Sequence, residues 1–90
     1  MTLESDYHNL INEIVAKQIV ILGPSTVLLK AKNIQGLKLN DAGKVVSIDG
    51  DPQQVLQNLV NEYILLSGQI VKNILNPVFA KYPHIKVAIN

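Results

Sequence analysis

The residues with the clearest potential for chemistry are two aspartates separated by a glycine, Asp49-Gly50-Asp51. Carboxylates at this spacing occur in calcium loops, but an EF-hand needs about six ligands over about twelve residues and ends in a glutamate. Here Pro52 follows at once, and proline is favoured in the first turn of a helix. We therefore interpret Asp49 and Gly50 as a turn and Asp51 as a helix N-cap, and we expect no metal.

A second candidate is the segment Gly23-Pro24-Ser25-Thr26 at the start of an expected helix. Free backbone N–H groups at a helix start can bind an anion. The segment nevertheless lacks the glycine spacing and the lysine of a phosphate-binding P-loop. We expect it to be a turn that leads into a helix.

The two histidines, His8 and His84, lie near opposite ends of the sequence and show no metal-ligand spacing. We expect both on the surface. The serines lack the context of a nucleophile elbow, and the carboxylates are explained by caps, turns and solvated helix faces. No pair suggests general acid–base work. The sequence thus predicts no catalytic residues and no cofactor, so we expect a protein that is not an enzyme.

Composition limits the partners. The 90 residues are sufficient for a single domain, 1–90, and 48% of them are hydrophobic. There is no cysteine, and the net charge is +1. All basic residues are lysine, and the lack of arginine makes a nucleic-acid partner a poor match. An AT-rich genome, which uses few arginine codons, is the alternative explanation for the lack of arginine.

The ends and apolar runs of the chain give no targeting or membrane signal. The first ten residues, MTLESDYHNL, are polar and acidic, unlike a secretory signal. The apolar run over residues 14–29 is interrupted by polar residues and by Pro24, so it is too short to span a membrane. We expect a cytoplasmic protein.

The first half of the chain predicts two helices. Apolar residues recur at helical spacing from about Ser5, which could act as a cap, to Leu22. Residues 19–22 are continuously apolar and the first three are β-branched, so a short buried strand is the alternative to a last helical turn; we favour the helix. Pro24 begins the second helix, and Asn33 or Gly36 ends it.

A β-hairpin is predicted over residues 37–48. Apolar and polar residues alternate on both sides of Asn40-Asp41-Ala42-Gly43. Asn and Asp favour the start of a type I turn, and Gly43 can adopt the positive φ that a following bulge requires. Because a lone hairpin is marginal in water, one face must pack on the helices or on another chain.

A long apolar helix is predicted over residues 52–76. Asp51 is the expected N-cap, and Gln54 could reach back to complete a capping box. We expect Gly68 to be tolerated inside this helix at a cost of about 1 kcal/mol. One stripe at helical spacing forms either the core or the interface: Leu56, Leu59, Tyr63, Leu66, Ile70 and Ile74.

The end of the chain predicts a short helix and an arm. Asn76-Pro77 repeats the arrangement of Asp51-Pro52, so a last helix should begin there and stop before Pro83. Residues 84–90 alternate apolar and polar side chains, which is compatible with a strand or with an ordered arm.

The predicted fold class is therefore α+β, mostly helical, in the order α-α-β-β-α-α. A domain this small buries little of its surface, so the excess of apolar surface favours a protein–protein interaction or regulatory module. We expect a homo-oligomer, most simply a homodimer, or another protein partner. Two alternatives remain: a winged-helix-like DNA-binding regulator, suggested by the order of elements, and a binder of an apolar small molecule.

Overall fold

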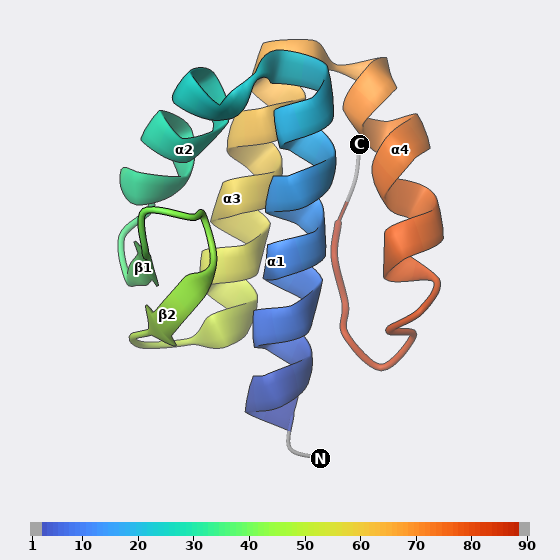
Figure 1. Cartoon of the computed structure of the whole chain (residues 1–90). Helices are drawn as coiled ribbons and strands as arrows, with labels where there is room; N and C mark the ends of the chain where they lie inside the picture. Colours follow the sequence, from blue (N-terminus) through green and yellow to red (C-terminus); the bar gives the residue numbers. More distant parts are fainter. Residues whose placement is uncertain (1–2, 89–90) are drawn as a thin grey trace.

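The computed structural model describes residues 3–88, and it has the predicted α+β order (Figure 1). Helix α1 lies at the centre, with α2 and the hairpin on one side and α4 on the other. No helix within residues 3–88 is long and apolar enough to cross a membrane. The elements are α1 (Leu3–Leu22), α2 (Pro24–Lys32), β1 (Leu37–Leu39), β2 (Val45–Ile48), α3 (Pro52–Ser67) and α4 (Gln69–Phe79).

Helix α1 is longer than predicted at its start and helical to its end. It begins at Leu3, so Ser5 lies in its first turn rather than at its cap. The ambiguity over residues 19–22 is resolved as helix, and the backbone N–H of Gly23 still donates to the Ile19 carbonyl over 2.9 Å. The next peptide carries no N–H because residue 24 is proline, which ends the hydrogen-bond ladder.

The hairpin forms as predicted, and its turn is built around one side chain. The Asn40 side-chain oxygen accepts hydrogen bonds from the backbone N–H groups of Ala42 and Lys44, over 2.9 and 3.0 Å. Gly43 adopts φ +81°, and an added Cβ would lie 2.9 Å from a methyl carbon of Leu28. Glycine is therefore required here both for the backbone and for close packing on α2.

The hairpin is held against α1. Strand β1 pairs antiparallel with β2, with Leu37 opposite Ile48 and an irregularity between Lys38 and Leu39. The backbone N–H of Val45 donates to the side-chain oxygen of Asn12 on α1, over 2.8 Å. This bond satisfies an edge donor of a two-stranded sheet that would be marginal alone.

Asp51 is the N-cap of α3, as predicted, and its carboxylate accepts a hydrogen bond from the Gln53 backbone N–H over 3.1 Å. The predicted capping box is wrong. The Gln54 side chain donates to Asn58 along the helix, over 2.9 Å, instead of reaching back to Asp51. An i,i+4 amide pair of this kind stabilises a helix by about 0.2–0.5 kcal/mol.

The predicted continuous helix over 52–76 is wrong, because the chain reverses at Gly68. Gly68 adopts φ +58° and ψ −124°, which ends α3 and starts α4. Helix α4 folds back beside α1 and α3 (Figure 1), where it buries Val71, Leu75 and Val78. The apolar period continues through the reversal because both helices present an apolar face to the same core.

The predicted helix start at Asn76-Pro77 is also wrong. Pro77 lies inside α4, which continues to Phe79. Beyond it, residues 84–88 form an ordered arm rather than a strand, with Ile85 buried. The last part of the predicted arm, residues 89–90, lies outside the described residues.

Tyr63 lies at the centre of the core. Its side chain is fully buried, and its hydroxyl donates to the Val27 carbonyl on α2 over 3.2 Å. Burial raises the pKa of the Tyr63 phenol well above its ordinary value. Burial, and then the negative charge of Asp51, raises the pKa of Tyr7. Both phenols therefore favour folding only while they remain protonated.

This arrangement predicts a loss of stability at alkaline pH. In the unfolded chain Tyr63 ionises near its ordinary pKa of about 10, whereas in the folded chain it does not, so stability falls as pH rises above about 10. Tyr63→Phe should cost about 0.5–1.5 kcal/mol at neutral pH through the lost hydrogen bond. The variant should also lose less of its free energy of unfolding between about pH 7 and about pH 11 than the unmodified protein, as measured by urea unfolding. If both proteins lost the same free energy of unfolding at alkaline pH, the Tyr63 phenol would not be the cause of that loss.

Candidate interaction surface

The predicted interface stripe is divided between the core and the surface. Leu56, Leu59 and Tyr63 are fully buried within the folded chain. Ile74 is partly buried on α4. Leu66 and Ile70 are exposed, by 40% and 55%. In this conformation, only the part of the stripe that flanks Gly68 is available to another molecule.

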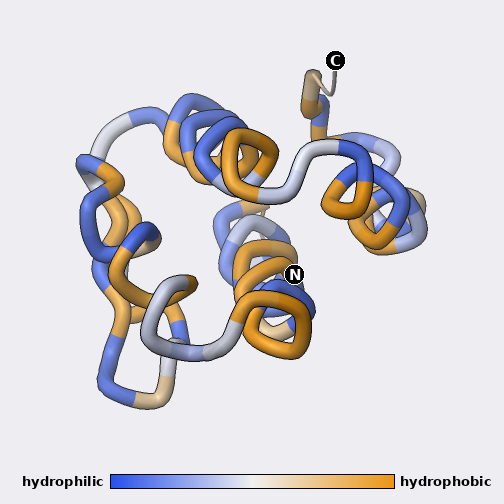
Figure 2. Tube along the Cα trace, turned by 90° about the horizontal axis from the view of Figure 1, so that it is seen from above, coloured by the Kyte–Doolittle hydropathy of each residue, from blue (hydrophilic) through white to orange (hydrophobic). Residues whose placement is uncertain are grey.

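The surface at this position is larger than the stripe predicted. Leu65, in the last turn of α3, is 81% exposed. Together with Leu66 and Ile70 it places three large apolar side chains around the α3–α4 turn, and we call these three residues the turn patch. Val20, near the end of α1, is 86% exposed. Helix α1 ends at the same end of the molecule as the α3–α4 turn (Figure 1). Figure 2 looks down on this end of the molecule and shows hydrophobic residues near the ends of α1 and α3.

Charge is missing from the chain segments that form this end. Residues 63–71 and residues 18–29 contain no lysine, aspartate or glutamate. Depletion of charge in the centre of a contact surface lowers the cost of desolvation and is typical of protein interfaces. A search for long uncharged segments would have found this region, which helical periodicity alone did not separate from the core.

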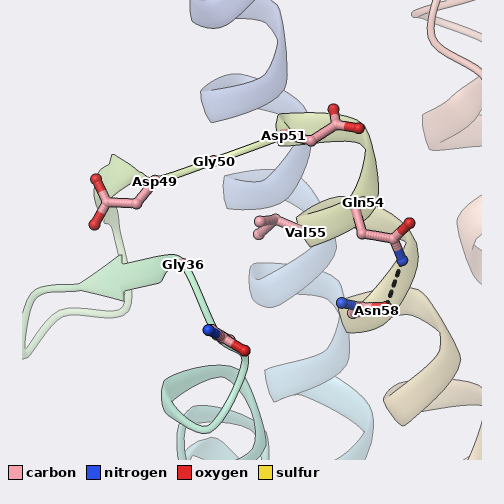
Figure 3. A pocket seen from close by; sticks show the side chains of 8 residues that line it. Gly36, Asp49, Gly50, Asp51, Gln54, Val55 and Asn58 are labelled. Carbon is pink, nitrogen blue, oxygen red and sulfur yellow. Dashed lines mark hydrogen bonds between the residues drawn. The ribbon is translucent and has the colours of Figure 1, made fainter.

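A hollow of about 540 Å³ lies between the segment before β1, the β2–α3 loop and the start of α3 (Figure 3). Its carboxylates do not converge. Asp51 is occupied as the N-cap, and the side chains of Asp49 and Asp51 point away from each other. On its other side, Gln54 and Asn58 are paired with each other. The hollow therefore presents amide groups and two separated carboxylates, an arrangement that does not chelate a cation.

Neither histidine belongs to a cluster of metal ligands. His84 Nε2 lies 2.8 Å from the Asp6 carboxylate, and His8 Nε2 lies 3.9 Å from Glu4. His84 is exposed, as predicted, but His8 is half-buried. Within residues 3–88 no group of three or more His, Asp or Glu side chains is placed to hold a metal ion. The contact between His84 and Asp6 joins the C-terminal arm to α1.

Comparison with known proteins gives no relative. The chain matches no protein-family model, no curated protein and no solved structure.

Proposed function

We propose that this protein is a small, non-enzymatic protein–protein interaction or regulatory module that self-associates as a homodimer. The observation that supports the proposal is the turn patch, Leu65, Leu66 and Ile70, on a part of the chain without charge. Exposed single apolar residues are ordinary, but three large ones within six positions concentrate apolar surface at one turn. Concentrated exposed apolar surface is typical of protein interaction sites.

In a symmetric homodimer, the turn patches of both chains would form the centre of the interface. Each residue of the turn patch is used twice in a symmetric pair, since the same surface is presented by both chains. A stable interface needs about 800 Å² from each partner. The turn patch would supply the apolar centre of this interface. Burying apolar surface contributes about 25 cal/mol per Å² before the cost of association is counted.

The proposal predicts that charge placed on the turn patch breaks the dimer without unfolding the chain. Leu66→Asp with Ile70→Asp should give a monomer, because two carboxylates per chain would be desolvated without partners. Both side chains are exposed by 40% or more, so the midpoint of urea unfolding of the monomer should change little. Light scattering after size-exclusion chromatography measures the mass.

The matched control carries the same change at the other end of the molecule. Leu3, the first residue of α1, and Val46, in β2, are 55% and 60% exposed. The start of α1 and strand β2 lie at the end of the molecule opposite the α3–α4 turn (Figure 1). The double variant Leu3→Asp, Val46→Asp should keep the mass of the unmodified protein. If the turn-patch variant remains folded with unchanged mass, this surface is not the interface.

A further inference from the structure

The C-terminal arm runs along α3 and is bound through its backbone. The side-chain amide of Gln57 pairs with both backbone groups of Ala88: it donates to the carbonyl and accepts from the N–H, each over 2.8 Å. One turn earlier, Gln53 donates to the carbonyl of Lys86, over 2.8 Å. Gln57 thus takes the place of a neighbouring strand, since a primary amide offers the same donor and acceptor as a peptide group.

The side chains of the arm alternate between the core and water. Ile85 is buried and Val87 is partly buried against the core, whereas Lys86 and Ala88 are exposed. This is the period of an extended chain. The site on α3 therefore has two components: amide groups that bind an extended backbone, and an apolar surface that accepts side chains two positions apart.

The amide row continues along α3 past Ala88, the last described residue of the arm. A hollow of about 480 Å³ begins at Ala88 and is lined along α3 by Gln57, Asn61, Ile64 and Leu65. Gln57 also donates to Asn61 over 3.0 Å, so Gln53, Gln57 and Asn61 form one row at steps of four along the helix. The described part of the arm covers only the first half of this row.

We propose that the row Gln53–Gln57–Asn61 and the apolar surface beside it form a binding groove for an extended peptide of a partner protein. The peptide would carry apolar side chains two positions apart, and it would take the place of the chain's own arm. Recognition of the backbone selects an extended conformation, as when a peptide is added to a sheet edge. The groove shares Leu65 with the turn patch, but neither Leu66 nor Ile70 lines it. The variant Leu66→Asp with Ile70→Asp, which should break the dimer, therefore leaves the lining of the groove unchanged.

The contacts of the arm are few enough for exchange. It is held by exposed amide hydrogen bonds, by the buried side chain of Ile85 with the partly buried Val87, and by the contact of His84 with Asp6. Segments with so few buried contacts open most easily. Because the arm is tethered, it acts at an effective concentration of about millimolar, and a free peptide must compete with it.

The test is titration of the full chain, labelled with ¹⁵N, with the blocked peptide Pro-His-Ile-Lys-Val-Ala, followed by NMR. Two variants weaken the arm. Ile85→Ala removes the buried side chain, and Ala88→Pro removes the N–H bound by Gln57 without touching the core. Each should bind the peptide about tenfold more tightly than the unmodified chain, because the competing arm is weaker by about 1.4 kcal/mol.

A second pair of variants tests the amide row. In the Ala88→Pro chain, Gln57→Met should weaken binding of the peptide about tenfold. Gln54→Met is the matched control, since Gln54 makes the same kind of amide pair along α3 and does not touch the arm. A peptide with Asp in place of Ile should not bind. Equal affinity in the unmodified and weakened chains, or equal effects of the two glutamine changes, would overturn the proposal.

Discussion

Leu59→Ala should destabilise the protein by about 2–5 kcal/mol. Leu59 is fully buried in the core cluster that includes Leu10, Ile14 and Leu75, so truncation leaves a cavity as well as removing apolar contacts. Small domains have a total stability of about 5–15 kcal/mol. A single truncation would therefore remove a large part of the free energy of unfolding.

The measurement is urea unfolding, with Leu65→Ala as the control. Leu65 is the same residue type on the same helix but is 81% exposed, and its truncation should change the free energy of unfolding of the chain by less than about 0.5 kcal/mol. Both proteins should be compared as monomers, in the background of the charged turn-patch variant. If Leu59→Ala were harmless there, Leu59 would not belong to the core of the chain.

Gly68→Ala should have the second-largest effect, a loss of about 1–3 kcal/mol. The reason is the backbone, since φ +58° with ψ −124° is a conformation that L side chains rarely adopt. Space is not the reason, because an added Cβ would meet nothing within 4 Å. Alanine also favours helix, so the variant should join α3 to α4 in part of the population.

If α3 and α4 joined into one helix, the face of α4 that carries Val71, Leu75 and Val78 would be exposed. Chains opened in this way can exchange α4, so larger species should appear in chromatography as concentration rises. The control is the chemically synthesised chain with D-alanine at position 68. D-alanine favours this φ and ψ, so its unfolding midpoint should equal or exceed that of the glycine protein. An L-alanine variant as stable as the glycine protein would contradict this account.

Local chemistry predicted most of the fold. Asp51 before Pro52 located the start of α3, and Asn40 with Gly43 located the hairpin turn, because each depends on groups only a few residues apart. The reversal at Gly68 was missed for a physical reason. Apolar residues recur at helical spacing on both sides of it, and one glycine with positive φ is sufficient to turn the chain.

The candidate surface was predicted only in part. Leu59 and Leu66 share one helical stripe, and periodicity does not distinguish a residue under another helix from one beyond the end of the core. The absence of charge over residues 63–71 carried that information in the sequence. The groove could not be predicted, since Gln57 and Ala88 meet only after α4 has folded back.

The most direct test of self-association is the molar mass of the unmodified protein by sedimentation equilibrium over a wide range of concentrations. The chain mass is 9.9 kDa. The proposed homodimer predicts twice this mass, unchanged by dilution over the range. A mass of 9.9 kDa at every concentration would contradict self-association.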